Sequence, residues 1–267
     1  MKANLQSIAS SQEALLSSLT QRCLRWNGRR HSYRPAGEPL KTDSYGVEPI
    51  DEEQAKAFVT RHHYSGSYPA ARFRAGLFEH RAFQGGRLVG VAVFSVPMTQ
   101  AVIPKYLGVG ADAGVELGRF VLLDDVPANA ETWFLARAFK AMRRHLSVDG
   151  VVSFCDPVAR FDTEGREVKR THTGVIYRAH NATPAGRTLA RTLLLMPNGL
   201  CASDRTLSKI RNEEVGMDYA MRQLLSAGAP TRWVGETGCD WVRRLRRDGF
   251  FRSVRHPGNL AFTWKWK

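Results

Sequence analysis

Hydrophobic residues recur along the chain with two spacings, one typical of strands and one typical of helices. Apolar runs predict strands at residues 77–84, 87–96, 115–123, 151–155, 188–196 and 260–266. Helical spacing predicts helices at residues 52–61, 130–146 and 213–227, and an N-terminal helix that begins at the capping pair Ser10 and Glu13. The pair Gly85-Gly86 separates the first two strands by a tight turn and predicts a hairpin.

The order of these elements favours one fold class. A helix, a hairpin, a strand, a helix and another strand follow one another, with a mixed remainder. This order predicts an α+β fold around one mixed sheet rather than a series of β-α-β units. Residues 27–48 are polar and contain Gly, Pro and Arg, so we interpret them as a linker or an arm that touches phosphate. We therefore expect an N-terminal helix and basic linker over 1–50 and one domain over 51–267, ending in a basic segment.

Composition narrows the class of protein. Of the 267 residues, 43% are hydrophobic and 24% are charged, which is typical of a globular protein. No apolar run is long enough to span a bilayer, and the N-terminus lacks the apolar stretch of a signal peptide, so we expect a cytoplasmic protein without membrane contact. The cysteines have no C-x-x-C pairing, which argues against a cysteine zinc site or a disulfide framework.

The net charge of +14 points to a polyanionic partner. About half of it lies in residues 241–267, where aromatic residues alternate with basic ones and Asp248 is the only acid. We predict that this segment binds double-stranded DNA through Arg243, Arg244, Arg246, Arg247, Arg252 and Arg255. Two alternatives stay open: a GC-rich genome also inflates arginine content, and the aromatic residues of a solvated basic tail belong to the core.

Two segments around the strand 115–123 have candidate chemistry. The helix start Asn129-Ala130-Glu131 follows this strand, and free N–H groups there are suited to a cofactor phosphate. The alternative is an ordinary crossover helix, and no Walker or G-x-G-x-x-G pattern is present. Strict alternation would put Glu116, Gly118 and Phe120 on one face of the strand and Arg119 on the other. A buried Arg119 needs a partner, and Asp156 on a neighbouring strand is one candidate.

Two further segments contain acid–base groups. Asp156-Pro157 ends a buried strand, where a carboxylate is suited to accept the proton of an exocyclic amine; the alternative is an aspartate that caps a turn. His62-His63-Tyr64 stands in a loop rich in Gly, Ser and Pro, where the side chains are suited to base, stacking or metal roles. A structural turn is again the alternative.

Several segments together resemble the bacteriophage Mom-type DNA-modification proteins, which are similar to an offshoot of the GCN5-related acyltransferase (GNAT) fold. They cover about residues 55–267 in the expected order. The matching segments are His63-Tyr64-Ser65-Gly66, residues 88–94, residues 116–122, Asn129-Ala130-Glu131-Thr132, Ser153-Phe154-Cys155-Asp156-Pro157, residues 172–177 and His256-Pro257-Gly258-Asn259.

The resemblance implies conversion of adenine in phage DNA to N6-(carbamoylmethyl)adenine, which protects the DNA from restriction in the host cytoplasm. It implies catalytic residues at His63, Tyr64, Arg119, Asp156 and Tyr177, and it associates iron with His63 and Tyr64. On this basis we hypothesise that Asp156 deprotonates the adenine amine of an extruded base and that Arg119 orients Asp156 or stabilises negative charge. Tyr64 or Tyr177 would stack on the base, and His63 would act as a base or an iron ligand.

The chain departs from the resemblance in one respect. The acyltransferase pyrophosphate loop is absent, and Asp124 and Asp125 stand in its place, where their charges repel a pyrophosphate. This argues against coenzyme A as the donor, and the sequence leaves the cofactor and the oligomeric state open. The alternative functions are a coenzyme A-dependent N-acyltransferase acting on another amine and a non-catalytic DNA-binding protein.

Overall fold

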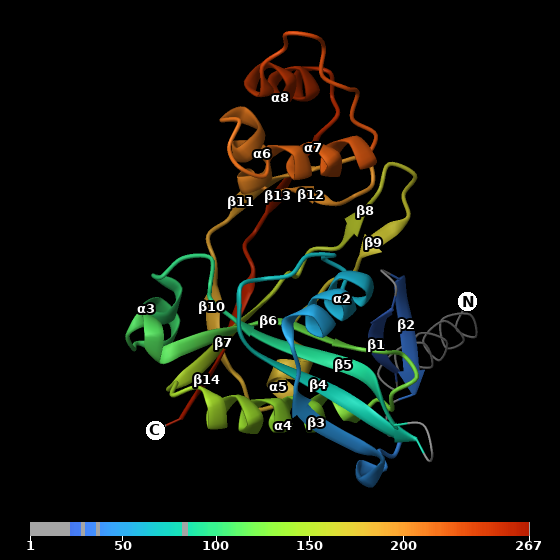
Figure 1. Cartoon of the computed structure of the whole chain (residues 1–267), viewed down its shortest axis with the longest axis vertical. Helices are drawn as coiled ribbons and strands as arrows, with labels where there is room; N and C mark the ends of the chain where they lie inside the picture. The colour runs from blue at the N-terminus through green and yellow to red at the C-terminus, as the bar shows by residue number, and fades with distance from the viewer. Residues whose placement is uncertain (1–21, 28–29, 36–37, 82–84, 267) are drawn as a thin grey trace, which may run out of the picture. The chain divides into compact units, whose positions relative to one another are not determined.

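A computed structural model (Figure 1) describes residues 22–27, 30–35, 38–81 and 85–266. The helix expected after Ser10 lies outside these residues. The chain divides into two compact units. Unit 1 comprises the described part of residues 1–155 with residues 174–186 and 261–267, and unit 2 comprises residues 156–173 and 187–260. Residue 50, where we expected a division between domains, lies inside unit 1.

Unit 1 is built on a seven-stranded sheet with the order β10-β14-β7-β6-β5-β4-β3. Its strands are β3 (Tyr45–Pro49), β4 (Ala71–Arg81), β5 (Gly85–Ser95), β6 (Gly114–Leu122), β7 (Gly150–Cys155), β10 (Thr183–Arg187) and β14 (Leu260–Lys265). The strands β3 to β6 pair antiparallel in chain order, whereas β6 and β7 pair parallel.

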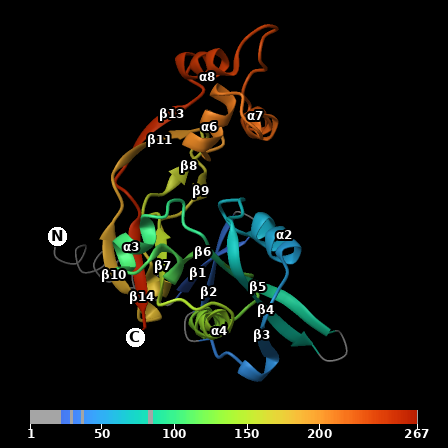
Figure 2. The same cartoon turned by 60° about the vertical axis from the view of Figure 1, so that its left-hand side comes forward.

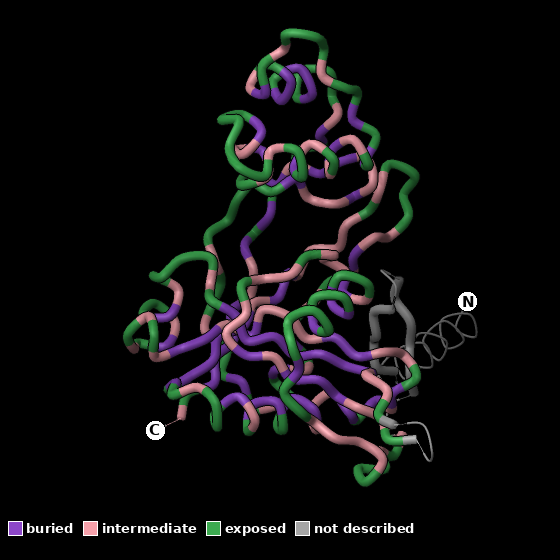
Figure 3. The backbone as a smooth tube through the Cα atoms, in the orientation of Figure 1, coloured by how far each residue is buried: buried purple, intermediate pink, exposed green. Residues whose placement is uncertain are grey.

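Helices cover both faces of this sheet (Figure 2). They are α2 (Glu52–His62) on one face, α4 (Ala130–His145) on the other, and the short α3 (Val102–Leu107) and α5 (Val175–Ala179). The predicted α+β class with a mixed central sheet flanked by helices is confirmed. Buried residues concentrate in β5, β6 and β7 and in the inner face of α4 (Figure 3). The side chain of Asp51 caps α2, because it accepts the N–H of Gln54 at 2.8 Å.

The interpretation of residues 27–48 as a linker is wrong. β1 (Arg22–Asn27) and β2 (Arg30–Pro35) form an antiparallel hairpin, and a single 3₁₀ turn (Thr42–Ser44) leads into β3. β3 pairs with β4 over its whole length. Polar, glycine-containing sequence conceals an edge strand such as β3, because its hydrogen bonds come from β4, which is distant in the sequence.

Unit 2 combines two small sheets with a group of helices. β11 (Arg191–Leu195) lies between β12 (Cys201–Ala202) and β13 (Arg252–His256), and β8 (Arg160–Phe161) pairs with β9 (Glu167–Lys169). The helices are α6 (Asp204–Arg211), α7 (Met217–Ser226) and α8 (Gly238–Arg247). The helix predicted at 213–227 is α7, which begins only at Met217. It starts later than predicted because Glu213 and Gly216 have left-handed backbones, with φ of 52° and 89°. The strand predicted at 188–196 is the shorter β11.

The aromatic residues of the basic C-terminal segment belong largely to the core. Trp241 is fully buried in α8, and Phe251 and Trp264 are each 8% exposed. For these three side chains, the alternative that the aromatic residues belong to the core therefore holds, and they are not free to stack on nucleic-acid bases.

In the described part of the chain, no helix combines the length and hydrophobicity needed to cross a membrane.

Candidate active site

The central strand β6 has a bulge at Gly118. Phe94 of β5 lies opposite Leu117, and the preceding Val93 lies opposite Arg119, so Gly118 is an extra residue on the β6 side. A bulge changes the alternation of side chains in the strand that contains it, and bulges are common next to active sites.

Because of the bulge, Glu116 and Arg119 share a face of the sheet. Glu116 lies opposite Ser95, and Val93, opposite Arg119, packs into the apolar cluster of α2. The strict alternation assumed from the sequence, which put Glu116 and Arg119 on opposite faces, is therefore wrong. A Cβ atom at Gly118 would overlap Oγ of Ser95, so a side chain at this position would force Ser95 to move.

Arg119 is held by the loop that follows α2. Its Nε donates to the carbonyl of Ser67 at 2.9 Å, and its Nη2 lies 2.9 Å from the Ser67 hydroxyl. Burial lowers the pKa of Arg119, while the neighbouring Tyr64, Glu116 and Tyr177 oppose this change. Three of the residues predicted from the resemblance, Tyr64, Arg119 and Tyr177, thus interact electrostatically within unit 1.

Glu116 is the titratable acid of this cluster. Burial raises its pKa from 4.5 to about 7, although the charge of Arg119 opposes the increase. A carboxyl group with such a pKa exchanges protons near neutral pH, as a general acid or base requires. Glu116 is not among the residues predicted from the sequence, although a glutamate inside an apolar strand and close to an arginine was the signal available.

Tyr177 approaches the cluster from α5. Its ring is 5% exposed and contacts Phe262, with 5.7 Å between ring centroids. Burial raises the pKa of its hydroxyl, which hydrogen-bonds with Ser153 of β7 and interacts with Glu116. Gly174 starts α5 with a left-handed backbone (φ 74°), and a Cβ there would fall on the ring of Phe262. Tyr177 is therefore a neutral phenol in a fixed position.

The cluster lies where β6 and β7 separate. Their paired residues end at Glu116 and Val152, although β6 continues to Leu122 and β7 to Cys155. The Ser153 hydroxyl donates to the carbonyl of Leu117 at 2.9 Å just beyond the last pair. Where two parallel strands diverge beside a bulge, backbone N–H and C=O groups that would otherwise be paired within the sheet become free.

His63 lies in the same loop as Tyr64, with 4.3 Å between the two ring centroids. Nδ1 of His63 accepts the N–H of Ser65 at 3.2 Å and lies 2.9 Å from the Ser65 hydroxyl. Among the described residues, no three His, Cys, Asp or Glu side chains gather as metal ligands. An iron site at His63 and Tyr64, which the resemblance implies, stays a prediction.

Asp156 begins unit 2 and has charged partners there. Its Oδ1 accepts the N–H of Val158 at 3.0 Å and pairs with Nε2 of His256 at 2.9 Å, and its other oxygen forms an ion pair with Arg160. Lys169, 4% exposed, lies 3.4 Å from Oδ1. Burial alone would raise the pKa of Asp156, but His256, Lys169 and Arg160 hold it at about 2. This environment does not favour the role of general base that the sequence analysis gave to Asp156.

The predicted cofactor segment lies at the start of α4. Ala130 is buried at the start of α4, and the Asn129 side chain donates to the carbonyl of Glu38 at 3.2 Å. The N–H of Ala130 donates to the carbonyl of Pro127. A cofactor role for Asn129, Ala130 and Glu131 stays a prediction.

The predicted DNA-binding arginines differ in exposure. Arg244 is buried and paired with Glu236, so it is not available to a phosphate. Arg252 is exposed and donates to the carbonyl of Phe161 at 2.9 Å. The remaining arginines of the set are exposed: Arg243, Arg246, Arg247 and Arg255.

Around the bulge of β6, the mixed sheet brings together a titratable acid, a guanidinium and two phenols. This arrangement in an α+β protein is suited to proton transfer. The Mom protein family matches residues 44–229, and the chain belongs to this family of phage DNA-modification proteins. A search of curated proteins found no match. Among solved structures, a tandem GNAT protein from the clavulanic acid biosynthesis pathway (without AcCoA) is similar over 83% of this chain and 98% of that chain. The two chains are 9% identical in sequence, and the TM-score is 0.38.

Proposed function

We propose that this protein is a transferase that converts adenine in duplex DNA to N6-(carbamoylmethyl)adenine and so protects phage DNA from restriction. Membership of the Mom family supports the DNA substrate. The observation that supports a proton-transfer step is the Glu116–Arg119 pair on one face of the bulged β6, with Tyr64 and Tyr177 beside it. The amine of adenine is a poor nucleophile because its lone pair is conjugated into the ring, so transfer to it needs a proton acceptor.

Glu116 is suited to be this acceptor. An extruded adenine would present its amino group to the carboxylate, and the N6–H proton would pass to Glu116. The N6 lone pair would form a bond with the methylene carbon of the carbamoylmethyl group, while the donor's leaving group departs with its bonding electrons. Arg119, oriented by Ser67, would stabilise negative charge, and the Tyr64 ring would stack on the base.

Asp156 has a different part in this proposal. Its carboxylate stays ionised because its pKa is about 2, and its four partners within unit 2 fix the segment that follows β7. We therefore assign it a positioning role. His256 accepts the N–H of Gly258 at Nδ1, so its Nε2 carries the proton that Asp156 accepts.

The test is mass spectrometry of nucleosides from plasmid DNA of cells that express the protein or its Glu116→Gln variant. We expect a deoxyadenosine heavier by one carbamoylmethyl group with the wild-type protein and its loss with the variant, at equal amounts of folded protein. Unmodified DNA with the wild-type protein would contradict the proposal. Tight retention of acetyl-coenzyme A on the purified protein would instead favour a coenzyme A-dependent acyltransferase.

A further inference from the structure

The loop between α7 and α8 exposes apolar side chains at its tip. Trp233 is 64% exposed and Val234 fully exposed. Arg232 connects this loop to the one between α6 and α7, because its Nη2 donates to Glu213 at 3.1 Å and its Nη1 lies 3.9 Å from the sulfur of Met217. We call the two exposed apolar residues of the loop, Trp233 and Val234, the apolar tip.

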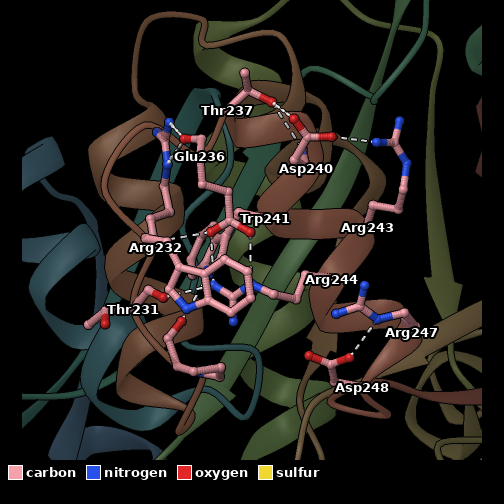
Figure 4. Close-up of polar contacts among 12 residues, drawn as sticks. Thr231, Arg232, Glu236, Thr237, Asp240, Trp241, Arg243, Arg244, Arg247 and Asp248 are labelled. Carbon is pink, nitrogen blue, oxygen red and sulfur yellow. Dashed lines mark hydrogen bonds and ion pairs between the residues drawn. The ribbon is translucent and has the colours of Figure 1, made fainter.

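The conformation of this loop is fixed by a buried ion pair. The carboxylate of Glu236 accepts hydrogen bonds from Nε of Arg244 at 2.7 Å and from its Nη2 at 2.8 Å (Figure 4). Both side chains are nearly buried. The same carboxylate accepts the N–H of Trp233 at 3.1 Å, and the N–H of Glu236 donates to the Trp233 carbonyl. Gly235 supplies the left-handed backbone that this turn needs (φ 79°). The hydrogen bonds from Arg244 lower the pKa of Glu236 to about 2, so the ion pair persists at neutral pH.

Further contacts attach the base of the loop to α8. Nη2 of Arg244 donates to the carbonyl of Thr231 at 2.8 Å, and the indole N–H of Trp241 donates to the carbonyl of Pro230 at 2.9 Å. The guanidinium of Arg244 lies 4.1 Å from the centre of the Trp233 ring. One face of the indole therefore packs against a paired cation, and the side chain is held in place before any partner binds. A preorganised aromatic side chain loses little conformational entropy on binding.

Basic side chains on α8 determine which partner suits this tip. The helix buries Trp241 and Leu245 and exposes Arg243, Arg246 and Arg247. In the part of the chain that the structure describes, the side chain of Arg246 has neither a hydrogen-bond nor an ion-pair partner. A rigid exposed tryptophan near exposed arginines, in a chain of net charge +14, is complementary to nucleic acid.

We propose that Trp233 and Val234 contact the bases of duplex DNA while the exposed arginines of α8 bind the neighbouring phosphates. Apolar side chains that enter a duplex at a base step unstack the bases there, and an aromatic ring provides a stacking surface of its own. Unstacking of this kind would favour extrusion of an adenine. Duplex DNA is chosen as the partner because it is the proposed substrate, so this inference rests on the proposed function. Residues 230–267 lie beyond the match to the Mom family, and nothing in that match assigns this contact.

The experiment measures binding of the full-length protein to a short fluorescein-labelled DNA duplex by fluorescence anisotropy, over a series of KCl concentrations. We expect Trp233→Ala to weaken binding about tenfold, because stacking on a base is lost, without a change in the slope of log Kd against log [KCl]. Trp233→Phe retains a ring and should restore most of the affinity. Arg246→Gln should instead reduce the salt slope by about one. The matched control is Leu189→Ala, which removes an exposed apolar side chain elsewhere in unit 2 and should leave affinity unchanged.

Two outcomes would overturn the proposal. One is wild-type affinity of Trp233→Ala for the duplex at every salt concentration. The other is a loss of affinity with Trp233→Ala that Trp233→Phe does not restore, accompanied by altered sedimentation of the DNA-free Trp233→Ala protein, which would make the apolar tip an interface with another protein chain. The binding assay does not depend on adenine modification, so an inactive wild-type protein that still loses affinity with Trp233→Ala would contradict only the proposed function.

Discussion

Replacement of Glu116 by glutamine should stabilise the protein at alkaline pH while it abolishes activity. The folded state raises the pKa of Glu116 from 4.5 to about 7, so the folded protein binds this proton more tightly than the unfolded chain does. Stability of the wild-type protein therefore falls as pH rises between these two values and is level above pH 7. With about 1.4 kcal/mol for each pKa unit, the ionised carboxylate costs at most about 3 kcal/mol. Partial access of solvent to the side chain makes this value an upper limit.

Glutamine has nearly the same shape and no charge, so it removes this cost. Urea denaturation of the wild-type protein and the Glu116→Gln variant, followed by tryptophan fluorescence at pH 4.5 and pH 8, tests the reasoning. We expect similar free energies of unfolding at pH 4.5 and a more stable variant at pH 8. A stabilising substitution that abolishes activity is typical of a functional residue kept at a cost in stability. A difference between the two proteins that does not change with pH would refute the raised pKa and with it the role of Glu116 as proton acceptor.

Two more substitutions test the structure around the site. Asp156→Ala leaves the buried Lys169 and the Arg160 guanidinium without their carboxylate and should reduce the free energy of unfolding by about 3 kcal/mol. Because the pKa of Asp156 falls from 3.8 to about 2, its contribution is present above pH 4 and lost as pH falls toward 2, so Asp156→Asn should show a weaker loss of stability in acid; equal acid sensitivity in urea denaturation would contradict this. Gly118→Ala places a methyl group on Oγ of Ser95 and should destabilise by about 1–3 kcal/mol. Adding Ser95→Ala should recover most of that loss in a double-mutant cycle, and no recovery would mean that the bulge is wrongly assigned.

Local patterns were sufficient for the elements whose signals lie within a few residues. The helices α2 and α4 depend on signals from neighbouring residues, and both lie close to where the sequence predicts them. The predicted hairpin of β4 and β5 also forms, but Gly85 and Gly86 pair with Arg81 and His80 at the start of β5 and are not its turn. The helices α6 and α8 were missed because charged residues dominate both segments. In α8, the arginine run conceals a buried face, and one of its arginines, Arg244, is itself buried in an ion pair.

The site was predicted only in part. The resemblance selected Tyr64, Arg119 and Tyr177, and the structure brings these residues together in unit 1. Glu116 was missed because a bulge is not visible in an alternating pattern: one extra residue at Gly118 moves Glu116 and Arg119 onto the same face. The role of Asp156 could not be judged from the sequence either, because His256, its hydrogen-bond partner, is 100 residues away along the chain.

By itself, the sequence determined the α+β class, the main helices and strands of the central sheet, and the strongly basic character of the chain. The elements follow from the periodicity of hydrophobic residues, which is a local property, and the basic character follows from composition, which is a sum over the chain. The tertiary structure decided which groups titrate near neutral pH and which are permanently charged. It also decided which aromatic residues are core and that Trp233 is exposed on a rigid loop. Each of these depends on burial and on partners distant in the sequence, because desolvation and charge pairing act through space and not along the chain.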